Sequence, residues 1–136
     1  MRVFLDTNIY ISAFATRGLC ADLLQVVLAD HQLVIGETVI AELRKNFGKK
    51  LGMPPALIEE TEAFLRAQAE VVSDAPSIAF KVRDPSDRWV VAEAFAGRAD
   101  ALVTGDNDLL SVAAKAPIRI VAPRAFWELL KAGPQM

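Results

Sequence analysis

The chain has 136 residues, of which 53% are hydrophobic and 24% are charged, and its formal net charge is -2 at pH 7. That length is typical of one compact domain and too short for two domains of ordinary size. The apolar stretches are shorter than the roughly 18 residues that suggest a membrane span, and residues 2–6 do not form the apolar region of a signal peptide, so we expect a soluble, cytoplasmic protein.

The residue types also restrict the chemistry. A single cysteine, Cys20, excludes an internal disulfide, and with a single histidine, His31, the chain has no Cys/His set for zinc. Any bound metal ion must therefore take oxygen ligands. The small negative net charge gives no general attraction to nucleic acids.

Strands and helices alternate along the chain. Short apolar runs rich in β-branched residues predict buried parallel strands at 2–5, 33–35, 70–72, 101–104 and 118–121. Helical apolar patterns fall between and after them, at 19–27, 39–47, 57–65, 89–95, 109–113 and 125–130. This alternation predicts one domain over residues 1–136, a three-layer α/β/α sandwich with a mainly parallel sheet of about five strands.

Acidic residues follow two of these strands directly. Asp6 comes after the first strand and Asp106 after the fourth, with Thr7 and Asn8 turning the chain from the first strand into a helix. The carboxyl ends of parallel strands meet at one edge of the sheet, and ligands gather where the strand order reverses. If these two strands are neighbours, Asp6 and Asp106 lie together in that crevice.

Two more acids are placed to join them. Glu42 borders the apolar stripe of its helix, and Asp87 lies in the first turn of the helix that precedes the fourth strand. Two carboxylates about 5 Å apart repel by roughly 3 kcal/mol at an effective dielectric constant of 20, so such a cluster needs a cation. Mg²⁺ or Mn²⁺ prefers these ligands, and one or two such ions suit phosphodiester hydrolysis.

Each acid also has a purely structural interpretation. Asp84 before Pro85 is a candidate helix N-cap, and Asp87 would then favour the helix dipole. Asp106 and Asp108 flank a helix start, where capping aspartates are common. Glu42 would be a partly solvated helix residue, and Asp6 would close its strand in an Asx turn.

The four acids lie in motifs that resemble a known family. "VFLDTN", "TVIAELRK", "DPSDRWVVAEAFAGRADALVTGDNDLL" and "IVAP" are similar, in content and order, to a PIN domain, and most of all to the small bacterial and archaeal PIN proteins that include the VapC-like toxins. The resemblance covers nearly the whole chain. It implies a metal-dependent ribonuclease that uses Mg²⁺ or Mn²⁺. It also implies a protein antitoxin encoded nearby and a homodimer.

The resemblance also assigns roles to residues. The family's four catalytic, metal-binding acids fall on Asp6, Glu42, Asp87 and Asp106. Asp108 either binds metal through water or caps its helix. The supporting residues that the match brings in are Thr7, whose hydroxyl would support Asp6, Asn8 beside it, Asp84 and Thr104. Ser86 stands where relatives often carry another acid, which lowers the local negative charge.

Basic residues near these acids are candidates for contacts with RNA phosphates. They are Arg44, Lys45, Lys49 and Arg88. A solvated helix face is the simpler explanation for the first three. Trp89, Trp127 and Tyr10 could stack on bases, but their spacing in apolar company favours core or interface positions. For a homodimer, "ADLLQVVLA" could supply an apolar face, and burial in the monomer explains it equally well.

Two other functions fit part of the pattern. A Mg²⁺-dependent phosphoacceptor or phosphatase domain also carries an aspartate at a strand end, but it needs an acid pair before that aspartate and a lysine at a strand end, which "VFLD" and "IRIVAP" lack. A non-catalytic PIN-like module that binds RNA or protein would not need the full set of acids.

Overall fold

The computed structural model describes residues 1–73 and 85–132 of the chain. Within them the strands form a five-stranded parallel sheet in the order β3-β2-β1-β4-β5. The strands are β1 (Arg2–Leu5), β2 (Gln32–Gly36), β3 (Glu70–Val72), β4 (Ala101–Val103) and β5 (Ile120–Val121). The predicted parallel sheet of about five strands is confirmed, and each strand lies at or within two residues of its expected position.

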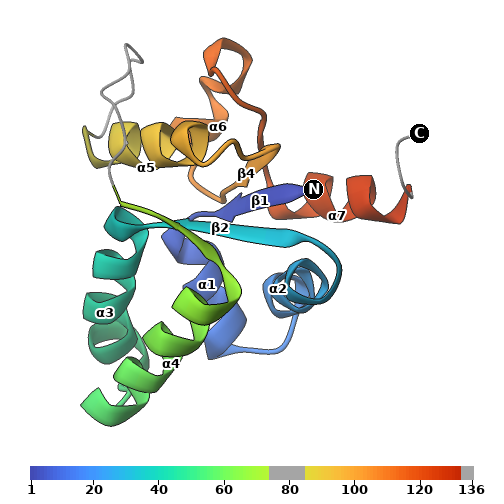
Figure 1. The fold of residues 1–136 in the computed structure, drawn as a ribbon. Coiled ribbons are helices and arrows are strands. Elements are labelled where there is room, and N and C mark those ends of the chain that lie inside the picture. Colours follow the sequence, from blue (N-terminus) through green and yellow to red (C-terminus); the bar gives the residue numbers. More distant parts are fainter. Residues whose placement is uncertain (74–84, 133–136) are drawn as a thin grey trace.

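Helices cover both faces of this sheet. They are α1 (Thr7–Ala15), α2 (Leu19–Asp30), α3 (Glu37–Leu51), α4 (Pro55–Gln68), α5 (Pro85–Ala96), α6 (Asn107–Leu110) and α7 (Pro123–Lys131), with a 3-10 turn at Ala113–Lys115. In Figure 1, α5 lies above the strands and α1 to α4 lie below them. The predicted three-layer α/β/α sandwich is therefore confirmed.

Local sequence explains where several helices begin and end. Gly52 ends α3 with a φ of 66°, a left-handed conformation that glycine adopts at little cost. Pro55 and Pro123 each start a helix at its first residue, where the missing N–H has no intrahelical partner to lose. Between β1 and β2 the apolar pattern marks one helix, at 19–27. The structure has two separate helices there, α1 and α2.

The two helices α1 and α2 meet at 108°. Among the described helices none is by itself long and apolar enough to cross a membrane, and only this bent pair passes such a test by length and composition. The apolar residues of α2 that are most buried, Leu23, Leu24 and Val27, contribute to the core of the monomer.

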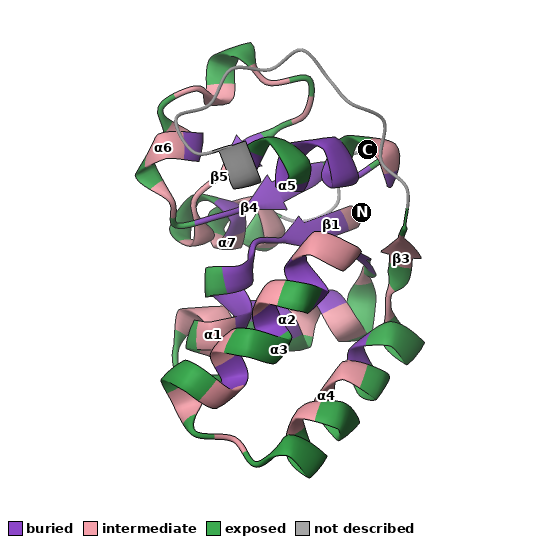
Figure 2. Ribbon diagram, turned by 90° about the vertical axis from the view of Figure 1, so that its left-hand side faces the viewer, coloured by how far each residue is buried: buried purple, intermediate pink, exposed green. Residues whose placement is uncertain are grey.

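The core is centred on β1, which lies between β2 and β4. Val3 is paired with Leu33 on one side and with Ala101 on the other, and Val3, Phe4 and Leu5 are completely buried. Figure 2 shows β1 and β4 as buried along most of their length. Tyr10 is also completely buried, as expected for a core residue, whereas Trp89 is 51% exposed and is not part of the core.

The strand order places the reversal of the sheet between β1 and β4. From β1 the chain adds β2 and then β3 on one side, and later adds β4 and β5 on the other. The carboxyl ends of β1 and β4 therefore border the crevice in which ligands bind in open parallel α/β sheets. Asp6 and Thr104 are the residues that directly follow these two strands.

The C-terminal end of α5 is fixed at the end of the sheet where the strands begin, which is opposite to the end that carries Asp6. The Arg2 guanidinium donates to the carbonyl of Gly97 at 3.0 Å and pairs with Glu70 at 2.8 Å. Gly97 packs so closely against β2 and β3 that an added Cβ would lie 2.5 Å from Val34 and 2.9 Å from Val72. These contacts determine how α5 crosses the sheet, and so where the residues that it carries lie.

Candidate functional site

Asp6 is buried at the carboxyl end of β1, with 6% of its surface exposed. Its backbone N–H donates to Val103 of β4 at 2.9 Å, which continues the pairing of the two strands. Its carboxylate is the N-cap of α1, because Oδ1 accepts the N–H of Thr7 at 2.8 Å. The second oxygen, Oδ2, accepts the hydroxyl of Thr104 at 2.7 Å. Asp6 is thus held by residues that follow both β1 and β4.

Thr104 connects Asp6 to Asp106. Its hydroxyl donates to Asp6 and accepts the backbone N–H of Asp106 at 3.0 Å. The Asp106 side chain in turn caps α6, accepting the N–H of Asp108 at 2.8 Å. The capping interpretation of Asp106 therefore describes one of its contacts, and the charge of its carboxylate is close enough to Asp6 to act on it.

Burial raises the pKa of Asp6, and the neighbouring negative charge of Asp106 raises it further, although the hydrogen bonds from Thr104 and Thr7 act in the opposite direction. A carboxylate in these surroundings is stabilised in its charged form by a nearby cation. The donors here are oxygen atoms only, which Mg²⁺ and Mn²⁺ prefer, and Mg²⁺ commonly uses one or two carboxylates together with water. Asp6 and Asp106 therefore fit such an ion.

The raised pKa of Asp6 predicts how metal-free stability depends on pH. The folded state binds the Asp6 proton more tightly than the unfolded state, so the free energy of unfolding falls as pH rises through the raised pKa. We expect Asp6→Asn, which has no such proton, to gain stability relative to the wild type between about pH 4 and pH 7. Urea denaturation in EDTA at several pH values measures this difference.

Glu59→Gln is the matched control for that experiment, because it removes one carboxylate charge at an exposed position on α4. Its stability should change with pH in parallel with the wild type. A difference between Asp6→Asn and the wild type that stays constant over this pH range would contradict the prediction.

The other two predicted acids come from helices. Asp87 lies in the first turn of α5 and is 7% exposed, and Glu42 lies on α3 and is partly buried. Among the residues that the structure describes, no three acidic, histidine or cysteine side chains come close enough together to bind one metal ion. The structure thus brings Asp6 and Asp106 together, and it does not gather Glu42 and Asp87 with them into a compact cluster.

The supporting residues differ in how they contribute. The buried Thr7 contacts Asp6 through its backbone N–H, and within the described part of the chain its hydroxyl has no hydrogen-bond partner. The hydroxyl that supports Asp6 belongs to Thr104. Asn8 is exposed and Asp108 is partly buried. Asp84 lies outside the described residues.

The candidate RNA-binding residues are on the surface. Lys45, Lys49 and Arg88 are exposed, and Arg44 forms an ion pair with Glu62 of α4 at 3.1 Å. An exposed pair of this kind contributes little to stability and leaves most of the Arg44 side chain accessible.

Glu93 of α5 is a buried acid that was not predicted to belong to this region. It is 4% exposed, and its Oε2 accepts the backbone N–H of Thr38 at 3.0 Å and the Thr38 hydroxyl at 3.1 Å. Burial raises the pKa of Glu93, and the negative charges of Glu37 and Glu42 raise it further. A glutamate inside the apolar run "VVAEAFA" is a sequence signal that could have identified it.

Comparison with known proteins agrees with this architecture. A family model of the PIN domain matches residues 2–108. Comparison with curated proteins gave no significant match. The structure is similar to VapBC-1 from nontypeable Haemophilus influenzae, with a TM-score of 0.67 and 18% identity, covering 91% of this chain and 99% of that one.

Two further solved structures show the same fold. VapBC2 from Rickettsia felis, bound to a DNA fragment from its promoter, matches with a TM-score of 0.64 and 16% identity, covering 90% of this chain and 98% of that one. The PIN domain endonuclease Utp24 matches with a TM-score of 0.51 and 20% identity, covering 89% and 84%. Because the family model spans most of the chain and the fold agrees, this chain belongs to the PIN domain family.

Proposed function

We propose that this protein is a metal-dependent endoribonuclease, which hydrolyses phosphodiester bonds in RNA in the cytoplasm and acts as the toxin of a toxin–antitoxin pair. The observation that carries the proposal is the buried Asp6, held beside Asp106 where the sheet reverses between β1 and β4. Membership of the PIN domain family and the folds of the VapBC proteins and Utp24 support it.

Each residue has a definite task in this proposal. Asp6 and Asp106 hold a Mg²⁺ or Mn²⁺ ion, and Glu42 and Asp87 complete the site directly or through water. When bound, the ion supplies charge stabilisation and activation of water for phosphodiester hydrolysis. Thr104 keeps the Asp6 carboxylate in one orientation through its hydroxyl. Asp108 either contributes to the site through water or only completes the start of α6.

Exposed basic residues and the family support the proposed substrate and partners. Lys45, Lys49 and Arg88 are exposed cations that contact RNA phosphates in this proposal, in the sequence-independent manner usual for such residues. The protein partners are an antitoxin, as the VapBC likeness suggests, and a second copy of this chain. Coexpression with the product of the adjacent gene, followed by size-exclusion chromatography, tests both partners.

The reaction itself is tested with purified protein and a mixed pool of RNA. We expect cleavage in Mn²⁺ or Mg²⁺ and none in EDTA, and we expect single-stranded DNA of the same sequences to remain intact. The fragments should arise from internal breaks in end-labelled RNA. Binding of RNA without cleavage at any metal concentration would favour a non-catalytic PIN-like module, and stable labelling of the protein by a small phosphodonor would favour a phosphoacceptor domain.

A further inference from the structure

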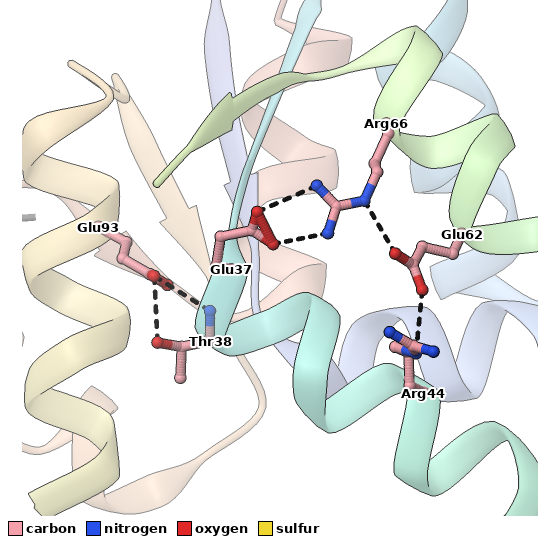
Figure 3. Close-up of polar contacts among 6 residues, drawn as sticks. All are labelled: Glu37, Thr38, Arg44, Glu62, Arg66 and Glu93. Atoms are coloured by element: carbon pink, nitrogen blue, oxygen red, sulfur yellow. Dashed lines mark hydrogen bonds and ion pairs between the residues drawn. The ribbon is translucent and has the colours of Figure 1, made fainter. Parts of the chain in front are cut away.

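Glu93 joins two helices that carry proposed site residues. It lies on α5, and its Oε2 accepts two hydrogen bonds from Thr38, in the first turn of α3. Figure 3 shows the Glu93 carboxylate directed at the backbone N–H and the hydroxyl of Thr38. No side chain of α3 or of the residue before it caps this helix, so the carboxylate from α5 satisfies one of its first N–H groups.

The chain leaves room for this contact. Gly36, the last residue of β2, precedes α3, and a Cβ added there would lie 2.0 Å from Oε1 and 2.3 Å from Cδ of Glu93. The backbone of Gly36 is extended, with a φ of -107° that any residue can adopt, so conformational freedom does not require glycine there. The close approach of Glu93 does require it.

The same two helices carry Glu42 and Asp87. Thr38 and Glu42 are four residues apart on α3 and lie on the same face of the helix, one turn apart. Asp87 and Glu93 lie on α5, less than two turns apart. The contact between Glu93 and Thr38 is therefore a buried link between the helix of Glu42 and the helix of Asp87.

A second set of contacts holds the start of α3 from the other side, but it is exposed. Arg66 of α4 forms two hydrogen bonds to Glu37 at 2.6 and 3.0 Å, and Glu62 bridges Arg66 to Arg44. The side chains of Arg66 and Glu37 are 39% and 40% exposed, so water competes with this pair. The buried constraint on the start of α3 comes from Glu93.

We propose that Glu93 is a positioning residue, which sets the location of Glu42 relative to Asp87 by fixing the first turn of α3 against α5. This inference rests on the proposed function, since it assumes that Glu42 and Asp87 contribute to one metal site. Glu93 acts in it through its reach to Thr38 and not through its charge.

Two substitutions separate reach from charge. Glu93→Gln removes the charge and keeps an oxygen that can accept the N–H of Thr38, whereas Glu93→Asp keeps the charge and is one methylene too short. We expect Glu93→Gln to bind Mn²⁺ close to the wild-type affinity and Glu93→Asp to bind about 10- to 100-fold more weakly, the usual effect of losing a residue that orients ligands. Calorimetric titration of the metal-free protein with Mn²⁺, without RNA, measures both.

Amide hydrogen exchange at Thr38 shows whether the contact itself is lost. Exchange should be faster in Glu93→Asp and unchanged in Glu93→Gln, because the Thr38 N–H donates to this carboxylate. Glu59→Gln and Glu59→Asp, at an exposed position on α4, are the matched controls and should leave Mn²⁺ affinity unchanged. Val27→Ala, in the buried face of α2, shows that general loss of stability does not reproduce the effect.

The outcomes distinguish this inference from the proposed function. Absence of Mn²⁺ binding by the wild type would overturn both. Suppose that the wild type binds Mn²⁺. The inference about Glu93 is then overturned, and the proposed function is not, if Glu93→Gln binds Mn²⁺ weakly or if Glu93→Asp binds it as tightly as the wild type does. In particular, weak binding by Glu93→Gln with wild-type binding by Glu93→Asp would show that the charge of Glu93 matters, as it would for a direct ligand.

Discussion

Asp6→Asn should reduce metal-dependent RNA cleavage by at least about 1,000-fold, because it removes several kcal/mol of charge stabilisation that a bound ion would provide. The protein should stay folded. Asparagine is as good an N-cap as aspartate, so its oxygen can still accept the N–H of Thr7, and the burial of a charge is avoided. The measurements are initial cleavage rates in saturating Mn²⁺ and thermal unfolding of the same preparations.

The control for this result is Asp30→Asn, the same chemical change at an exposed site next to the start of β2. It should cleave RNA at the wild-type rate. Cleavage by Asp6→Asn within tenfold of the wild type, in a protein that binds Mn²⁺ normally, would remove Asp6 from the site and with it the main support for the proposed function.

Gly36→Ala should lower the free energy of unfolding by about 3 kcal/mol, the upper range for overpacking a filled space. The added methyl group would lie 2.0 Å from Oε1 of Glu93, so the carboxylate must move away from Thr38 or the end of β2 must shift. Urea denaturation measures the loss. Gly48→Ala is a useful comparison, because its nearest atom is 3.6 Å away and alanine in a helix interior should stabilise the protein by up to about 1 kcal/mol.

A double substitution identifies the cause of that loss. In a Glu93→Ala background the space beside Gly36 is empty, so Gly36→Ala should cost less there by about 1 to 2 kcal/mol, the coupling expected for residues in direct contact. If Gly36→Ala costs the same with and without Glu93, the strain arises elsewhere at the end of β2. Wild-type stability in Gly36→Ala would show that Glu93 moves aside at no cost.

The sequence predicts most of this fold because its strands are short, apolar and β-branched, and because helices alternate with them. Val3, Phe4 and Leu5 are completely buried, as expected of a central parallel strand. The sequence left open whether the first and fourth strands are neighbours, and the pairing of Val3 with Ala101 shows that they are. Asp6 and Asp106 lie near each other because they follow two neighbouring parallel strands, so the order of the strands determines their proximity.

Contacts between distant residues are harder to predict. Glu93 contacts Thr38, 55 residues earlier in the chain, and the space that it fills is reserved by a glycine that the local backbone does not require. Likewise the hydroxyl that binds Asp6 belongs to Thr104, 98 residues away, and not to the adjacent Thr7. Trp89 has apolar neighbours in sequence but faces solvent, because Val90 and Val91 occupy the buried side of α5.

The central position of β1 has a consequence for synthesis of the chain. On the ribosome, β1 and β2 emerge early, but one edge of β1 stays without its partner until Ala101, Leu102 and Val103 have followed. Thr104 and Asp106 emerge only after that. A nascent chain therefore contains Asp6 long before it contains Thr104, whose hydroxyl orients the Asp6 carboxylate. If the protein is the ribonuclease proposed above, this order delays its activity on RNA until the ribosome has translated the codons for β4 and the residues that follow it.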